Sequence, residues 1–147
     1  MFDYKKRLNK LRAELIKKSL DSFLVTNETN VKYLSGFTGS DSLLLVTPSS
    51  QFFLADSRYT EEAKDSVEGF AIIEVTSSTY NTIGEIIKKN RIKKLGFESL
   101  NLPFEVARRL ERYIHPAKAV PLKNTIEVLR AVKDANEIGR IKKSVRI

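Results

Sequence analysis

Short runs of β-type residues alternate with amphipathic helical runs along nearly the whole sequence, and this alternation limits the fold more than any other feature. At the start, Leu8, Leu11 and Leu15 recur at helical spacing among lysines and arginines. The expected helices lie at 3–18, 27–36, 57–67, around 83–87, 101–110, 124–131 and 134–145, and the expected strands at 22–26, 42–47, 51–55, 70–75, 94–97 and around 119–120. Strands separated by helices predict an α/β fold with a layered sheet.

One pair of strands lacks an intervening helix. The runs 42–47 and 51–55 are joined by Pro48, Ser49 and Ser50, which are typical turn residues. These runs predict a hairpin, and a hairpin within a βα repeat makes the sheet mixed rather than purely parallel.

Helix-start signals occur twice in the second half. Asn101 is expected to cap a helix with Pro103 in its first turn, and Phe104, Ala107 and Leu110 are expected to face inward. Later, the segment Asp134-Ala135-Asn136-Glu137 resembles a capping box that opens a final helix. The final helix carries an apolar stripe of Ile138, Ile141 and Val145 after the domain is expected to be complete, so we expect the stripe to cover something else.

Composition excludes several classes of protein. Cysteine is absent, so there is neither a disulfide nor a thiol nucleophile. No apolar run approaches the ~20 residues of a membrane span, and the start of the chain does not resemble a secretory signal. We therefore expect a cytoplasmic protein without a membrane partner.

Catalytic and metal-binding residue types are scarce. The single histidine, His115, precedes a proline at the expected end of a helix, where a surface position is expected rather than a role as a general base. Asp56, Glu61 and Glu62 are the nearest approach to a carboxylate metal site, yet Asp56 is more simply explained as a helix N-cap. We expect no catalytic residue, metal or cofactor in this chain.

Two loops combine residue types that suit ligand binding. The segment from Tyr33 to Asp41 has two glycines, an aromatic residue and several hydroxyls, which fits either a ligand-facing loop or an ordinary turn. The second loop places Asp56, Arg58 and Tyr59 at the carboxyl end of a strand, where open α/β sheets tend to bind ligands. Arg58 could bind a carboxylate, or it could form an internal salt bridge with Asp56 or Asp41.

The net charge of the chain is +8, and its basic residues are concentrated at the two ends of the sequence. Segments such as residues 88–94 could attract nucleic acid or an acidic protein. Solvated helix faces explain the same pattern, and no aromatic residues are interleaved with the lysines as a single-strand platform requires. We expect no nucleic-acid partner.

The order of motifs resembles the N-terminal domain of the creatinase and prolidase family, which includes Xaa-Pro dipeptidases (prolidases) and Xaa-Pro aminopeptidases. The resemblance rests on the opening helix with Arg7 and Leu8 and on four further segments: Phe23-Leu24-Val25-Thr26-Asn27, Lys32 to Ser40, Phe53 to Ala63, and Leu129 to Ile138. Together these segments span nearly the whole chain.

The resemblance implies a three-layer α/β/α domain with a mixed sheet, spanning residues 1–123, followed by connector helices over 124–147 that lead to a C-terminal metallopeptidase domain. That catalytic domain would bind two divalent metal ions (Mn, Co or Zn) and hydrolyse Xaa-Pro bonds, so this chain alone is expected to be inactive. A homodimer of the parent protein and short proline-containing peptides are the implied partners. The alternative is a free-standing interaction module for an acidic partner, of the kind found in chromatin factors.

The resemblance also implies roles for the two loops. Residues Phe37, Thr38, Gly39, Ser40 and Asp41 would form the loop that gates or binds the substrate. Tyr33, Asp56, Arg58 and Tyr59 would orient that loop or contact the peptide.

Overall fold

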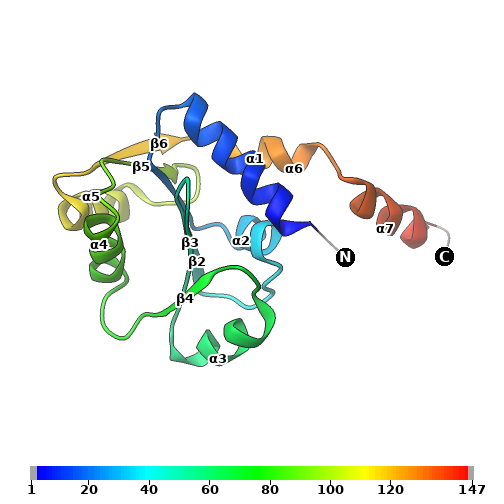
Figure 1. Cartoon of the computed structure of the whole chain (residues 1–147), viewed down its shortest axis with the longest axis horizontal. Coiled ribbons are helices and arrows are strands. Elements are labelled where there is room, and N and C mark those ends of the chain that lie inside the picture. Colours follow the sequence, from blue (N-terminus) through cyan, green and yellow to red (C-terminus); the bar gives the residue numbers. More distant parts are fainter. Residues whose placement is uncertain (1–2, 146–147) are drawn as a thin grey trace.

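The computed structural model describes residues 3–145, which form a six-stranded sheet between two layers of helices (Figure 1). The strands are β1 Ser22–Val25, β2 Ser42–Val46, β3 Gln51–Ala55, β4 Ala71–Glu74, β5 Lys94–Glu98 and β6 Lys118–Leu122. The helices are α1 Tyr4–Lys17, α2 Glu28–Ser35, α3 Ser57–Ser66, α4 Thr79–Lys89, α5 Phe104–Ile114, α6 Thr125–Ala131 and α7 Ala135–Val145. The expected α/β class is confirmed.

The sheet is mixed, as the hairpin predicts. Its strand order is β4-β3-β2-β1-β5-β6, and β2 runs antiparallel to both of its neighbours. The pairs β1–β5, β5–β6 and β3–β4 are parallel. The carboxyl ends of the other five strands therefore meet at one edge of the sheet, together with the amino end of β2.

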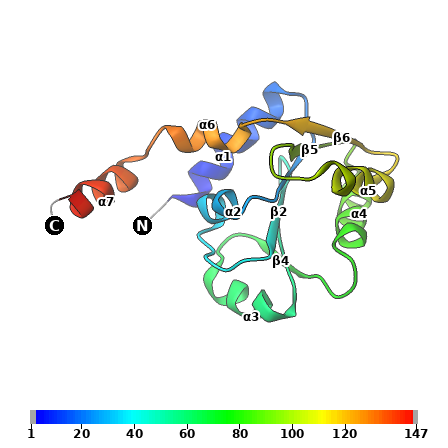
Figure 2. The ribbon, with the colours of Figure 1, turned by 180° about the vertical axis from the view of Figure 1, so that it is seen from behind.

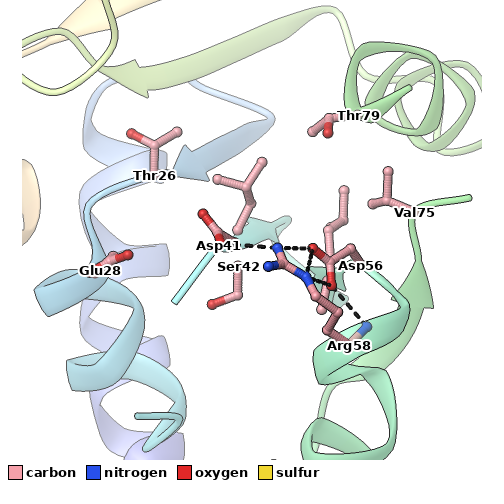
Figure 3. A pocket seen from close by; sticks show the side chains of 11 residues that line it. Thr26, Glu28, Asp41, Ser42, Asp56, Arg58, Val75 and Thr79 are labelled. Atoms are coloured by element: carbon pink, nitrogen blue, oxygen red, sulfur yellow. Dashed lines mark hydrogen bonds and ion pairs between the residues drawn. The ribbon is translucent and has the colours of Figure 1, made fainter. Parts of the chain in front are cut away.

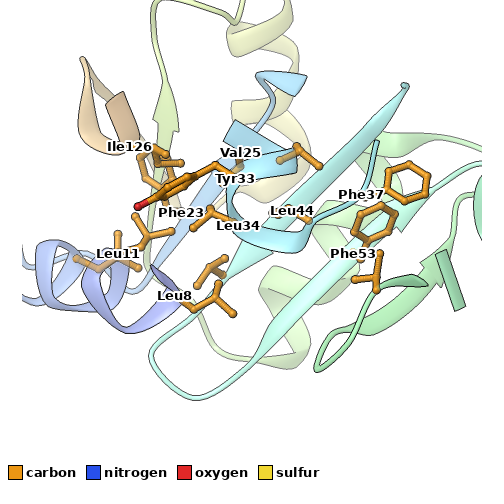
Figure 4. Close-up of a cluster of buried hydrophobic side chains, with 14 of the residues drawn as sticks. Leu8, Leu11, Phe23, Val25, Tyr33, Leu34, Phe37, Leu44, Phe53 and Ile126 are labelled. Atoms are coloured by element: carbon orange, nitrogen blue, oxygen red, sulfur yellow. The ribbon is translucent and has the colours of Figure 1, made fainter. Parts of the chain in front are cut away.

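Alternation along the central strands builds a core on each face. In β1, Phe23 and Val25 join one apolar cluster, whereas Leu24 joins the other, because successive side chains in a strand point to opposite faces. The first cluster receives α1, α2, α3 and α6, and part of it is drawn in Figure 4. The second cluster receives α4 and α5. This division gives the three-layer α/β/α arrangement.

The start of α5 differs from the sequence prediction in two respects. Pro103 occupies the N-cap position, and the Asn101 side chain donates to the Thr26 hydroxyl at 2.9 Å instead of capping the helix. Phe104 is 73% exposed, so its predicted inward orientation is wrong. The buried residues of α5 are Leu110 and Ile114, whereas Ala107 in the first turn packs against the second core while only partly buried.

The last two helices differ in how they join the body. Ile126 of α6 is fully buried in the first core, whereas α7 has no buried residue between Ala135 and Val145. Figures 1 and 2 both show α7 extending away from the layered body. The predicted capping box is confirmed, because the backbone N–H of Glu137 donates to Asp134 and that of Asp134 donates to Glu137. Within the described residues, none of the helices is both long and apolar enough to cross a membrane.

Candidate functional site

A cleft of about 480 Å³ opens at the carboxyl edge of the sheet (Figure 3). It lies where β1, β3 and β4 end, where β2 begins, and where α2, α3 and α4 start. The lining residues are Thr26, Glu28, Asp41, Ser42, Leu43, Leu54, Ala55, Asp56, Arg58, Val75 and Thr79. Three of these residues, Thr26, Leu43 and Thr79, also line a smaller apolar cavity beneath α4 and α5. This edge is where open α/β sheets tend to bind ligands.

Arg58 links the two loops that the sequence singled out. Its Nη2 lies 2.6 Å from Oδ2 of Asp56 and 3.2 Å from Oδ2 of Asp41, so the structure shows the internal salt bridges rather than an unpaired guanidinium. Arg58 nevertheless remains 66% exposed, so its guanidinium stays accessible to solvent. Hydrogen bonding to the Arg58 side chain lowers the pKa of Asp56, and Asp56 in turn raises the pKa of Arg58.

Asp56 performs the local role that the sequence predicts. Its Oδ1 accepts the backbone N–H of Arg58 at 2.9 Å and thereby caps the start of α3. Asp56 therefore lies between β3 and α3 and caps the helix. The same carboxylate holds the Arg58 side chain close to the loop that precedes β2.

The loop from Phe37 to Asp41 is anchored at one end and exposed at the other. Phe37 is buried, and its ring packs edge-on against Phe53 with centroids 4.9 Å apart and against Tyr59 at 6.2 Å. A Cβ on Gly39 would lie 2.5 Å from the Phe37 ring, so glycine is needed for this close approach. Thr38 and Asp41 are exposed.

Tyr59 holds the same loop from α3. Its hydroxyl lies 3.2 Å from the hydroxyl of Ser40, and the guanidinium of Arg58 lies 5.4 Å from the centroid of its ring. Two side chains from the first turn of α3, Arg58 and Tyr59, therefore fix the loop by polar contacts while Phe37 fixes it by packing.

Tyr33 does not line this cleft. It is buried on the α1 side of the sheet, where burial raises the pKa of its hydroxyl and Arg7 lies over its ring. Its hydroxyl donates to the carbonyl of Leu129 at 3.5 Å. The sequence grouped Tyr33 with Arg58 and Tyr59, but the structure separates them.

Sequence reasoning missed Glu98, a buried carboxylate at the carboxyl end of β5. Its Oε2 accepts the backbone N–H groups of Thr26 and Asn27 at 2.6 and 2.7 Å, and its Oε1 accepts the side-chain amide of Asn30 at 2.5 Å. The same amide nitrogen donates to Glu127. Glu98 thus joins β5 to the start of α2 beside the cleft, and the Asn30 amide extends this link to Glu127 of α6. A glutamate ending an otherwise apolar strand was the signal that could have identified it.

Within residues 3–145, no group of three or more His, Cys, Asp or Glu side chains is arranged to hold a metal ion. Asp56, which with Glu61 and Glu62 forms the nearest approach to a carboxylate metal site in the sequence, is paired with Arg58. His115 is exposed at the end of α5, as expected.

Comparison with known proteins identifies relatives over nearly the whole chain. Residues 7–132 match the family model described as the creatinase/prolidase N-terminal domain. The chain is 36% identical over 141 residues to the uncharacterized peptidase YqhT of Bacillus subtilis, covering 96% of this chain but only 40% of that protein.

Two solved structures give the same result. An Xaa-Pro dipeptidase from Bacillus anthracis superimposes with a TM-score of 0.88 at 27% identity, over 93% of this chain and 38% of that one. An Xaa-Pro aminopeptidase (aminopeptidase P) chain from Streptococcus thermophilus matches with a TM-score of 0.79 at 32% identity, over 86% of this chain and 98% of that one. The chain therefore spans about two fifths of the longer relatives.

Proposed function

The chain belongs to the creatinase/prolidase N-terminal domain family, and we propose that it serves as the non-catalytic, substrate-gating domain of an Xaa-Pro aminopeptidase or Xaa-Pro dipeptidase. The observation that carries this proposal is the similarity over 93% of the chain to 38% of an Xaa-Pro dipeptidase. The remaining length of such a relative is large enough for a second domain of ordinary size.

Hydrolysis would take place in the C-terminal domain of the parent protein. Two divalent metal ions (Mn, Co or Zn) held there would activate the attacking water. Residues 3–145 of this chain contain no group of side chains that fits a metal site. Its contribution would be to limit which peptides reach the metals and to keep bulk water, other than the attacking molecule, away from the reacting bond.

The loop from Phe37 to Asp41 is the part of the chain that suits gating. A gate needs a fixed base and an accessible tip. Phe37 supplies the base in the core, and Thr38 and Asp41 supply the tip, while Tyr59 and Arg58 restrain the loop through Ser40 and Asp41. These contacts support a role for Asp56, Arg58 and Tyr59 in orienting the loop.

The proposal also covers the rest of the parent protein. Residues 124–147 would connect the domain 1–123 to the catalytic domain, and the parent would act as a cytoplasmic homodimer on short proline-containing peptides. The exposed stripe of Ile138, Ile141 and Val145 on α7 supports the connector role, because an apolar helix face normally packs against another element.

A domain exchange tests the function. The N-terminal domain of the Bacillus anthracis Xaa-Pro dipeptidase would be replaced by residues 1–147, and kcat/KM would be measured for an Xaa-Pro dipeptide and for a longer Xaa-Pro peptide. We expect the chimera to be active, the chain alone to be inactive with Mn²⁺, Co²⁺ or Zn²⁺, and the catalytic domain alone to lose its preference for the shorter peptide. Turnover by the purified chain would contradict the non-catalytic role.

Loop variants of the chimera test gating more directly. Ser40→Ala removes the hydroxyl that meets Tyr59, and Asp65→Asn, on the exposed face of α3, is the matched control. We expect Ser40→Ala to change the ratio of kcat/KM for the two peptides by about fivefold, the worth of a hydrogen bond of about 1 kcal/mol. If the ratio of kcat/KM in Ser40→Ala equals the ratio in Asp65→Asn, this loop does not select peptide length.

A further inference from the structure

Arg7 is a buried cation at the junction of three helices. It lies in the first turn of α1 and is 5% exposed. Its Nη1 donates to the carbonyl of Tyr33 in α2 at 2.8 Å, and its guanidinium carbon lies 4.2 Å from the centroid of the Tyr33 ring. A stacked and hydrogen-bonded guanidinium has little rotational freedom, so groups that bind its Nη2 nitrogen are held in a fixed place.

The groups bound by that nitrogen are the two carboxylates that open α7. Nη2 of Arg7 lies 2.9 Å from Oδ2 of Asp134 and 3.2 Å from Oε1 of Glu137. The other oxygen of each carboxylate serves the capping box: Oδ1 of Asp134 accepts the N–H of Glu137 at 2.8 Å, and Oε2 of Glu137 accepts the N–H of Asp134 at 2.9 Å. Each carboxylate therefore joins Arg7 to the backbone of the first turn of α7.

Apolar packing does not provide a second attachment for α7. None of its residues from Ala135 to Val145 is buried, and Val132, in the connection from α6, is 69% exposed. A rigid helix held at its first turn points in the direction set by that turn. In Figure 1 the start of α1, which carries Arg7, lies beside the connection between α6 and α7.

We infer that Arg7 is a positioning residue that sets the direction of α7 relative to the domain, through the two carboxylates of its capping box. Resting on the proposed function, the inference adds that Arg7 fixes how Ile138, Ile141 and Val145 are presented to the catalytic domain. The segments concerned are 127 residues apart in sequence, so the contact depends on the folded domain.

Distance measurements between spin labels test the positioning role in the chain itself. The protein has no cysteine, so labels can be attached at Ala13→Cys in α1 and Lys142→Cys in α7, both of which are exposed positions. We expect one narrow distance distribution in the parent chain and a distribution at least twice as wide in Arg7→Met. Arg7→Lys should give an intermediate width, because an ammonium group lacks the planar fork that binds the Tyr33 carbonyl through one nitrogen and both carboxylates through another.

A second variant keeps the experiment decisive if Arg7→Met unfolds the domain. The double substitution Asp134→Asn and Glu137→Gln keeps side-chain carbonyl groups for the capping box but removes both negative charges from α7. It should widen the distribution about as much as Arg7→Met while leaving the circular dichroism spectrum unchanged. Arg58→Met, on the exposed ion-pair cluster, is the control and should leave the width unchanged. A narrow distribution in the double variant would overturn the inference.

The link to catalysis is measured separately in the active chimera. The double variant should lower kcat/KM about tenfold with a larger effect on kcat than on KM, since it misplaces a whole domain rather than a substrate contact. Unchanged kinetics would overturn the link between Arg7 and the catalytic domain. Because the spin-label distances do not depend on peptidase activity, an inactive chimera would contradict the proposed function while the distances still decide the role of Arg7.

Discussion

Two arginines in this domain each bridge two carboxylates, but they do so in opposite surroundings. Arg7 is 5% exposed and ties α1 and α2 to the first turn of α7. Arg58 is 66% exposed and ties the start of α3 to the loop before β2. Their ion-pair distances overlap, so the number and length of the contacts do not distinguish the two clusters.

Burial distinguishes them. Removing one partner of a buried pair leaves a charge that water cannot fully solvate, whereas an exposed pair exchanges its contacts for water at little cost. The Arg7 cluster is therefore suited to holding an element in one direction, and the Arg58 cluster is suited to a loop that must respond to a ligand. Substitutions at the two clusters and at nearby positions test this difference.

Arg7→Met should produce the largest loss of stability. We expect the free energy of unfolding to fall by about 3 kcal/mol, the lower end for broken buried pairs, because Asp134 and Glu137 keep partial access to water. Chemical denaturation followed by circular dichroism measures the change. A loss as small as that of Arg58→Met would remove the distinction between the clusters.

Glu98→Gln should follow. The carboxylate accepts two backbone N–H groups and the Asn30 amide while 7% exposed, and a glutamine can reproduce only part of this acceptor set. We expect a loss of about 2 kcal/mol from groups left unsatisfied. The matched control is Glu105→Gln on the exposed first turn of α5, for which denaturation curves should coincide with those of the parent chain.

Two glycine-to-alanine substitutions compare the packing of the cleft loop with the packing of α7. Gly39→Ala in the cleft loop would press a Cβ against Phe37 and should cost about 1–2 kcal/mol. Gly139→Ala in α7 has no atom within 4 Å of its Cβ and should favour the helix by up to about 1 kcal/mol. Thermal melting measures both changes in stability. If Gly39→Ala stabilises the domain as Gly139→Ala does, the loop that contains Gly39 can shift to accept the methyl group.

Arg58→Met should leave the melting temperature of the domain almost unchanged at neutral pH, since the cluster is open to water. Any small difference in stability from the parent chain should disappear in acid. Arg58 lowers the pKa of Asp56, so the stabilisation from this pair is present at neutral pH and is lost as the pH falls below about 4, the ordinary range of an aspartate.

NMR titration of the Asp56 carboxyl carbon provides the measurement. The midpoint should move upward in Arg58→Met, whereas the midpoint of Asp134 should stay low, because the backbone N–H of Glu137 and the side chain of Arg7 lower that pKa. If the Asp56 midpoint does not move, the ion pair with Arg58 is not maintained in solution.

Much of the fold could be predicted from residue spacing. The leucine pattern of α1, the hairpin of β2 and β3, and the capping box at Asp134 are all local features, and all were found where expected. Predictions that required tertiary packing were less accurate. Phe104 fits the apolar spacing of α5, but the first turn of this helix contains no buried residue, so spacing alone could not show that Phe104 is exposed.

The candidate site was partly predictable for the same reason. Asp56, Arg58 and Tyr59 are close in sequence, and their placement after β3 identified the carboxyl edge of the sheet. Tyr33 was grouped with them because it begins the segment that contains the loop from Phe37 to Asp41, yet one helical turn is enough to direct its side chain toward α1 and α6 rather than the cleft.

Sequence patterns therefore established the α/β class, most helix and strand positions and the local cap at Asp56, because each depends on residues close to one another in the chain. The order of such local motifs along the chain established the resemblance to the peptidase family. The tertiary structure alone decided that Glu98 joins β5 to the start of α2, that Phe37 anchors its loop from the core, and that Arg7 meets Asp134 and Glu137. These contacts join segments that come together only when the chain folds around the sheet. The burial that sets their energies does not exist in the unfolded chain.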